Sequence, residues 1–358
     1  SLSAAVSILR KLSISSNQDG TMITRLSITP KTLVFNNAGS FIEDEKGTRY
    51  KGTCIGCGDS PCMEYTDAEL YTPLFQAFPH NTSKRVCPTR AITCDSDSRY
   101  ACINPDLCIA CGLCVQRCPT AAIQFDFASR KCVVNSTPSI TQSCTETEQR
   151  EFIECAKSCQ QKCLFTKIPV TFSELYQESI YNASKRIADV SEIIVRNTLV
   201  NMGIPCKTNA AGNNHNRTEF FGQQGDMIII GESNSSDTDT LSITRRILDD
   251  VAVMVSRYRI DAKKIRPLSV INGFPNKRTD YYEVVHDIQS ILGIQISTVT
   301  YHLLFVLNLF GIKLSITDFT AFFIDNTDQD LLPALRSKIP DIATIDDNCG
   351  GINYHPIK

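Results

Sequence analysis

The densest cysteine pattern of the chain lies in residues 108–119. Two, two and three residues separate four cysteines there, and a proline follows the fourth: Cys108, Cys111, Cys114, Cys118 and Pro119. Such short spacings let three thiolates of one tight loop converge on a cubane of iron and sulfide. Gly112 permits close backbone approach, so that N–H groups can hydrogen-bond the sulfurs. Cysteines this close are poorly placed to form disulfides with one another, so the run predicts an iron–sulfur site.

A second, stretched copy of this run precedes it. The copy comprises four cysteines and a proline, namely Cys54, Cys57, Cys62, Cys87 and Pro88. The two copies share a tail, because residues 87–92 read Cys-Pro-Thr-Arg-Ala-Ile and residues 118–123 read Cys-Pro-Thr-Ala-Ala-Ile. An internal repeat of this kind predicts two pseudo-symmetric halves.

Over roughly residues 50–136 the repeat resembles the two-cluster bacterial ferredoxins. In that family the fourth cysteine of each run ligates the other cluster. The resemblance therefore implies two 4Fe-4S clusters with crossed ligands. One cluster would take Cys54, Cys57, Cys62 and Cys118, and the other would take Cys108, Cys111, Cys114 and Cys87.

The first run departs from the family pattern in two places. Four residues separate Cys57 from Cys62, where the compact pattern has two, and twenty-four separate Cys62 from Cys87, where it has three. Within this insertion, residues 67–78 predict a short helix. The four thiolates remain, but a three-iron cluster at the first run is an alternative.

The remaining cysteines are assigned less directly. Each Cys-Pro pair precedes a predicted hairpin, residues 91–103 and 122–135, and we expect the hairpin cysteines to be small buried apolar residues: Cys94, Cys102 and Cys132. Another four stand farther along: Cys144, Cys155, Cys159 and Cys163. The last three share one helix face but rise too far along it for one metal ion, so packing is favoured over a further metal site.

From about residue 169 the pattern changes to alternating helices and strands. We expect helices over residues 172–202, 241–258 and 281–292, and strands over residues 204–208, 218–221, 227–234 and 267–272. Residues 222–225 form the predicted turn of a hairpin. Residues 299–314 are apolar but interrupted by polar side chains, and we expect a buried helix there.

Over roughly residues 170–315 this order resembles the core of the PD-(D/E)xK nuclease superfamily. The resemblance implies Mg²⁺ bound by Glu219 and Glu232 across the hairpin, with Glu192 as a third acid. Asn234 stands where the family has its lysine, which removes the group that activates water. The alternative is an ordinary hairpin with solvent-facing glutamates.

Composition favours a globular protein without a membrane span. Of the 358 residues, 42% are hydrophobic and 21% charged, and the net charge is −2. The N-terminus has no signal-peptide pattern, so we expect a cytoplasmic protein without a membrane partner. Residues 185–278 carry 14 Lys and Arg against 10 Asp and Glu. The basic region 245–278 could contact nucleic acid, or it is a solvated helix end.

The predicted fold is an α+β ferredoxin-like two-cluster module fused to an α/β domain with a central mixed sheet flanked by helices. We expect N-terminal strands in residues 1–50, the module in 51–136, a cysteine-containing linker helix in 137–168 and the α/β domain in 169–358. One hypothesis is an iron–sulfur protein that binds nucleic acid or cuts it with Mg²⁺. The other is an electron-transfer or redox-sensing protein that serves a partner enzyme.

Overall fold

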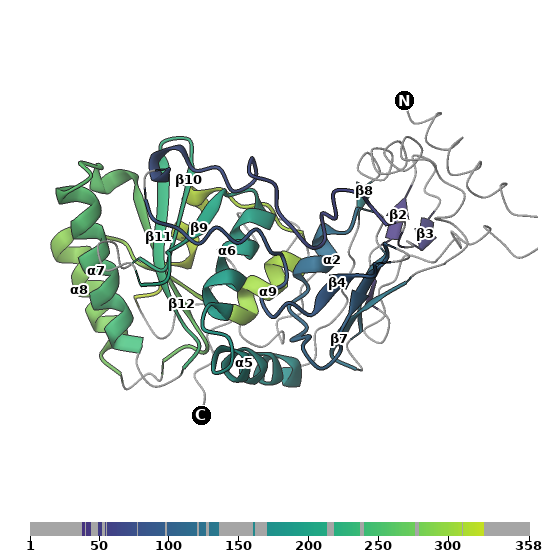
Figure 1. Ribbon diagram of the computed structural model, residues 1–358. Coiled ribbons are helices and arrows are strands. Elements are labelled where there is room, and N and C mark those ends of the chain that lie inside the picture. Colours follow the sequence, from purple (N-terminus) through teal and green to yellow (C-terminus); the bar gives the residue numbers. More distant parts are fainter. Residues whose placement is uncertain are drawn as a thin grey trace, which may run out of the picture. The chain divides into compact units, whose positions relative to one another are not determined.

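The computed structural model describes most of the chain between residues 38 and 325. The described residues are 38–39, 41–43, 49–51, 54, 56–76, 78–96, 99–119, 122–126, 129–135, 160–161, 170–212, 218–236, 240–275, 279–309 and 311–325. They belong to two compact units, the first formed by residues 1–64 and 85–166 and the second by residues 65–84 and 167–358 (Figure 1). Of the predicted linker helix, residues 137–168, the structure describes only Gln160 and Gln161, which form a strand and not a helix, while its four cysteines lie outside the described residues.

The first unit is built from short antiparallel strands around the cysteine runs. Strand β4 (Ile92–Cys94) pairs with β5 (Ala101–Ile103), and β6 (Ile123–Asp126) pairs with β7 (Lys131–Val134). The predicted hairpin after each Cys-Pro pair is therefore confirmed. The other elements are β1 (Ala38–Gly39) beside β6, β2 (Phe41–Glu43) between β3 (Arg49–Lys51) and β8 (Gln160–Gln161), and helix α2 (Leu113–Arg117).

The second unit is organised around a five-stranded mixed sheet. Its strands run in the order β13 (Ser297–Thr300), β12 (Ile265–Ile271), β11 (Met227–Asn234), β10 (Phe220–Gln224) and β9 (Cys206–Thr208). The first three are parallel and the last three antiparallel, as predicted for a mixed sheet. Strands β11 and β12 are buried along nearly their whole length because helices cover both of their faces. Gly231 is required in β11, since a Cβ there would stand 2.0 Å from the Leu268 carbonyl oxygen.

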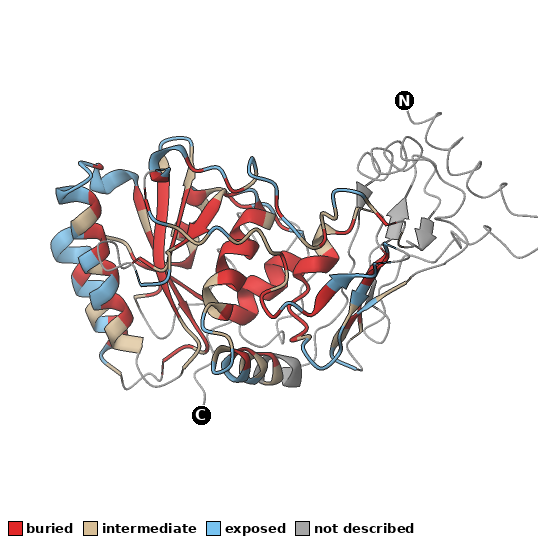
Figure 2. Ribbon diagram, in the orientation of Figure 1, coloured by how far each residue is buried: buried red, intermediate tan, exposed pale blue. Residues whose placement is uncertain are grey.

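Helices cover both faces of this sheet. Figure 1 shows α7 (Thr240–Ser256) and α8 (Tyr281–Leu292) on one side, and α5 (Val170–Ser184), α6 (Val190–Met202) and α9 (Tyr301–Leu309) on the other. Helix α9 is buried at every position, whereas α7 and α8 keep an exposed outer face (Figure 2). Short 3₁₀ turns complete the unit: η2 (Pro73–Phe75), η3 (Ala262–Lys264) and η4 (Ile316–Phe322).

Four sequence predictions differ from these elements. The helix expected over residues 172–202 is divided into α5 and α6, because a turn at 185–189 brings Asp189 to the start of α6. Residues 67–78 hold turns and η2 instead of a helix. The hairpin turn is tighter than expected, at Gly225 and Asp226. Residues 299–314 begin in strand β13 before they enter α9.

The insertion of the first cysteine run belongs to the second unit. Its residues 65–84 lie along the edge of the sheet, where the Asn81 N–H donates to the Thr208 carbonyl at 2.9 Å. Phe75 and Phe78 pack on Phe221 of β10, with ring centroids 4.7 and 6.0 Å away. Within the described part of the chain, none of the helices has both the length and the apolar composition that crossing a bilayer needs.

Candidate iron–sulfur centres and acidic cluster

The thiols of Cys54, Cys57, Cys62 and Cys118 form one group. Burial, together with the charge of Cys118 and of Cys54, raises the pKa of Cys57 to about 12. Burial also raises the pKa of Cys62, and the charges of Cys118, Cys57 and Cys54 raise it further. Each of these thiols is thus within electrostatic reach of the others. The group joins the first run to the last cysteine of the second run.

The thiols of Cys87, Cys108, Cys111 and Cys114 form another group. Burial raises the pKa of the Cys111 thiol, and the charges of Cys87 and Cys108 add to the effect. A hydrogen bond with Cys132 lowers the pKa of Cys114, but burial and the charges of Cys111, Cys87 and Cys108 outweigh it and bring the pKa to about 11. This group joins the second run to the last cysteine of the first.

Backbone N–H groups donate to sulfur in both groups. The N–H of Ala91 lies 3.1 Å from the Sγ of Cys87, and the N–H of Ala122 lies 3.2 Å from the Sγ of Cys118. The N–H of Ala101 donates to Cys54 at 3.4 Å, and that of Cys132 donates to Cys108 at 3.4 Å. Hydrogen bonds of this kind stabilise negative charge on a ligand sulfur.

Tight backbone turns bring the sulfurs together. Gly112 has a φ of 68° and directly precedes α2, so the chain turns sharply between Cys111 and Cys114. Ala110 also takes a positive φ, 59°, which a non-glycine residue adopts at some energetic cost. At the other end of α2, the Nε of Arg117 donates to the Pro61 carbonyl at 2.8 Å. This bond ties the residue before Cys118 to the loop that carries Cys62.

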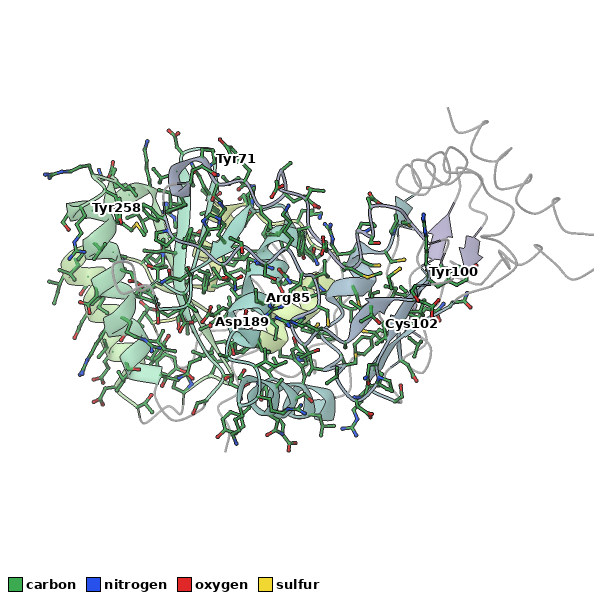
Figure 3. All side chains as sticks on the ribbon, viewed as in Figure 1. Tyr71, Arg85, Tyr100, Cys102, Asp189 and Tyr258 are labelled. Atoms are coloured by element: carbon green, nitrogen blue, oxygen red, sulfur yellow. The ribbon has the colours of Figure 1, made fainter. Side chains whose placement is uncertain are left out.

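Cys132 contacts the second group of thiols, which its position in the sequence did not predict. Its thiol is buried and hydrogen-bonds the thiols of both Cys108 and Cys114. No motif spacing relates it to the run, because β7 brings it there from the second hairpin. The prediction that all three hairpin cysteines are buried is wrong for Cys94 and Cys102, which are exposed (Figure 3 labels Cys102).

The chemistry of these donors fits iron–sulfur clusters. Burial opposes ionisation of the thiols, and iron supplies the positive charge that lets buried thiolates form. Each group provides four sulfurs, which is the ligand number of a 4Fe-4S cluster. Cys54, Cys57, Cys62 and Cys118 would hold one such cluster, and Cys87, Cys108, Cys111 and Cys114 would hold the other.

Comparison with known proteins agrees with this chemistry. Residues 101–124 match the family of 4Fe-4S binding domains. The chain is also 30% identical over 123 residues to an uncharacterized ferredoxin of Methanocaldococcus jannaschii, an alignment that covers 31% of this chain. The chain spans 65% of that relative's own length. These similarities support an iron–sulfur, ferredoxin-like module around residues 101–124.

The acidic residues singled out in the sequence lie in the second unit, where Glu219 directly precedes β10, Glu232 belongs to β11 and Glu192 belongs to α6. Glu219 is held by Ser233, whose N–H and hydroxyl donate to its Oε2 at 2.7 and 2.6 Å. Glu232 pairs with Arg246 of α7, with 2.9 Å between Oε2 and Nε. The alternative of solvent-facing glutamates is wrong for Glu232, which is 2% exposed.

Burial makes these carboxyl groups weak acids. Burial, with the charges of Glu219 and Asp189, raises the pKa of Glu192 to about 8. Burial, with the charges of Glu219 and Asp250, raises the pKa of Glu232 to about 9. Within the described ranges, no three His, Cys, Asp or Glu side chains are placed to hold a single metal ion. A four-iron cubane is larger than one ion, so this result concerns the acids and not the thiol groups.

Two further parts of the nuclease resemblance can be located. Asn234, at the position of the family lysine, accepts a hydrogen bond from the Ser236 N–H at 2.8 Å and so forms a local turn. In the basic region, Arg257, Arg259 and Lys263 are exposed, and Lys264 pairs with Asp226 at 3.1 Å. These positions are open to solvent, as both a nucleic-acid contact and a solvated helix end require.

Proposed function

We propose that this protein is a one-electron carrier with two 4Fe-4S clusters, which exchanges electrons with a redox partner protein. The observation that carries the proposal is the crossed grouping of the eight thiols. Cys118 lies with the first run and Cys87 with the second. Each cluster, when bound, takes up and returns one electron.

The chain's own groups would tune and protect the two sites. N–H donors to Cys87 and Cys118 favour the more negative, reduced state of each site and therefore raise its reduction potential. Burial of Cys62, Cys111 and Cys114 keeps water away from the sulfurs. The half-buried Cys54, Cys57, Cys87 and Cys108 leave each site one side nearer to solvent, as exchange with a partner requires.

Anaerobic analysis of the purified chain tests the cluster count. We expect about eight irons and eight sulfides per chain, and Mössbauer spectra of two 4Fe-4S clusters. In a reductive titration followed by electron paramagnetic resonance, each chain should take up two electrons. About four irons per chain after full anaerobic reconstitution would mean that the chain binds one cluster only. About seven irons would indicate a three-iron cluster at the first run.

A second candidate function is Mg²⁺-dependent cleavage of nucleic acid by the second unit. The observation that favours it is a cluster of three acids with raised pKa values, Glu192 of α6, Glu232 of β11 and Asp250 of α7. Such clusters are more typical of functional sites than of structural ones. Glu192, Glu219 and Glu232 would be the ligands. Metal binding would require that Glu219 and Glu232 exchange their partners Ser233 and Arg246 for the ion.

Cleavage of plasmid DNA and of RNA by the holoprotein with Mg²⁺ tests this candidate. Activity should disappear in Glu219→Gln and Glu232→Gln, and it should remain in a variant of the exposed Glu178 on α5, Glu178→Gln. Equal activity in all three variants would assign any cleavage to a contaminant or another site. Without cleavage by the unmodified chain, the second unit would have no nuclease activity.

A further inference from the structure

A cavity of about 320 Å³ lies within the second unit, beside the edge strand β9. The insertion, residues 65–84, forms one wall, and α6 and β9 form the other. A cavity of this size is at the lower end of the range for small-molecule sites. None of the residues that line it belongs to the thiol groups or to the acids near the hairpin.

Positive charge dominates the lining. Three cations, Lys84, Arg196 and Lys207, face one carboxylate, Asp67. The Asp67 side chain is 86% exposed and pairs with Lys84 at 2.7 Å. Lys207, which lines the same cavity, is only 8% exposed. Charges this deeply buried are rare unless an anion accompanies them.

Lys207 has unused hydrogen-bonding capacity. Within the described residues its Nζ has one hydrogen-bond partner, the Nε2 of His80 at 3.3 Å, and no carboxylate stands at ion-pair distance. An ammonium group has three hydrogens to donate. At least two of them are therefore available to a ligand in the cavity.

The neighbours of Lys207 hold it toward the cavity. The Nδ1 of His80 donates to the Phe78 carbonyl at 2.8 Å, which leaves Nε2 as the acceptor that Lys207 contacts. Nη1 of Arg196 donates to the Ser83 carbonyl at 2.6 Å, and its Nε donates to the Asn197 amide oxygen at 2.9 Å. Lys207 is thus held by a neutral nitrogen acceptor, which does not cancel its charge, and Arg196 is fixed beside the cavity by these two bonds.

From this cavity we infer a second binding site of the chain, one that takes a small phosphorylated molecule. A phosphate group offers the negative charge and the several acceptor oxygens that Lys207 requires. Leu70 and Tyr71 line the cavity as well and give an apolar surface for the rest of the molecule. Tyr71 is 53% exposed, so it lies at the outer side of the cavity. The site is independent of the proposed electron transfer.

Calorimetric titration of the anaerobic holoprotein tests the site. The probes are inorganic phosphate and adenosine monophosphate, and KCl of equal ionic strength is the control. Both anions should bind, and Lys207→Met should weaken the binding about tenfold or more. Lys207→Arg should retain most of it. Lys263→Met changes the charge equally on the exposed η3 turn and should bind as the unmodified chain does.

Three results would overturn the inference. They are no heat beyond that of KCl, binding unchanged in Lys207→Met, and an equal loss of binding in Lys263→Met. Should Lys207→Met not fold, Lys84→Met at the rim of the cavity replaces it, with a several-fold weaker binding expected. A DNA oligonucleotide, tested with and without a 5′-phosphate, is the last probe. Tighter binding of either form than of adenosine monophosphate would assign the cavity to nucleic acid instead.

Discussion

The backbone N–H of Ala122 donates to the Sγ of Cys118 across 3.2 Å, four residues after that cysteine. The same bond joins Ala91 to Cys87 at 3.1 Å, at the equivalent position of the repeat. The shared Cys-Pro-Thr tail thus places one N–H donor behind each fourth cysteine. This repetition in space explains why the two tails are alike in sequence although the runs before them differ in length.

The crossed grouping leads to a prediction about Cys118 and Cys87. In a chain whose Cys108, Cys111 and Cys114 are all replaced by alanine, only the first group can hold a cluster. Addition of Cys118→Ala should then remove the remaining iron, whereas addition of Cys87→Ala should leave about four irons per chain. Iron and sulfide analysis after anaerobic reconstitution measures both.

The reverse background supplies the control for this test. With Cys54, Cys57 and Cys62 replaced by alanine, Cys87 should be required and Cys118 dispensable. Uncrossed ligands would give the opposite dependence in each background. Far-ultraviolet circular dichroism of every variant establishes that the second unit, which holds none of these cysteines, is still folded.

Cys132 gives a second prediction. Its thiol hydrogen-bonds the thiol of Cys108, so it stands where a missing ligand could be replaced. Cys108→Ala should therefore retain more iron than Cys111→Ala. The double variant Cys108→Ala/Cys132→Ala should retain no more iron than Cys111→Ala. Equal iron in Cys108→Ala and the double variant would show that Cys132 does not substitute. The single variant Cys132→Ala should keep its full iron content.

Local spacing predicts that the thiols of one cysteine run lie together, but it does not predict their neighbours. The thiols of Cys108, Cys111 and Cys114 are held by one loop, so their sequence separation determines their arrangement. Cys132 reaches the same place only because β7 pairs with β6, where Cys132 lies opposite Phe125. Strand register of this kind depends on the packing of a whole hairpin, and a short motif contains no information about it.

The acids at the hairpin illustrate a second limit. The spacing of Glu219 and Glu232 predicts that the two residues face each other across the β10–β11 hairpin, and Phe220 indeed pairs with Gly231. Their burial could not be predicted, since it depends on helices that are distant in sequence. Arg246, the partner of Glu232, comes from α7, whose docking on the sheet is a property of the complete unit.

Glu192 provides a pH-dependent prediction. Its pKa is raised from 4.5 to about 8, mainly by burial, so the native state favours the protonated carboxyl. Its contribution to stability is complete below about pH 4.5 and is lost as the pH rises through about 8. Glu192→Gln imitates the protonated form. The variant should therefore gain about 1–3 kcal/mol over the unmodified chain at pH 8, and little at pH 5.

Urea unfolding of the second unit between pH 5 and pH 9 measures this difference. Glu178→Gln, at an exposed position of α5, serves as the control and should show no such pH-dependent gain. A Glu192→Gln variant that is less stable than the unmodified chain at every pH would mean that the native state needs the ionised carboxylate.

The last prediction concerns the attachment of the insertion. Tyr65 is 2% exposed, and its hydroxyl lies 2.8 Å from the Oδ1 of Asn201 and 3.1 Å from the Asn197 carbonyl of α6. Tyr65→Phe removes this donor and leaves buried acceptors, so the second unit should lose about 1–2 kcal/mol in its free energy of unfolding. Tyr71→Phe makes the same chemical change at an exposed position of the same segment and should alter it by less than about 0.5 kcal/mol. Urea unfolding of both variants measures the difference, and equal stability would mean that the Tyr65 hydroxyl does not contribute to holding the insertion.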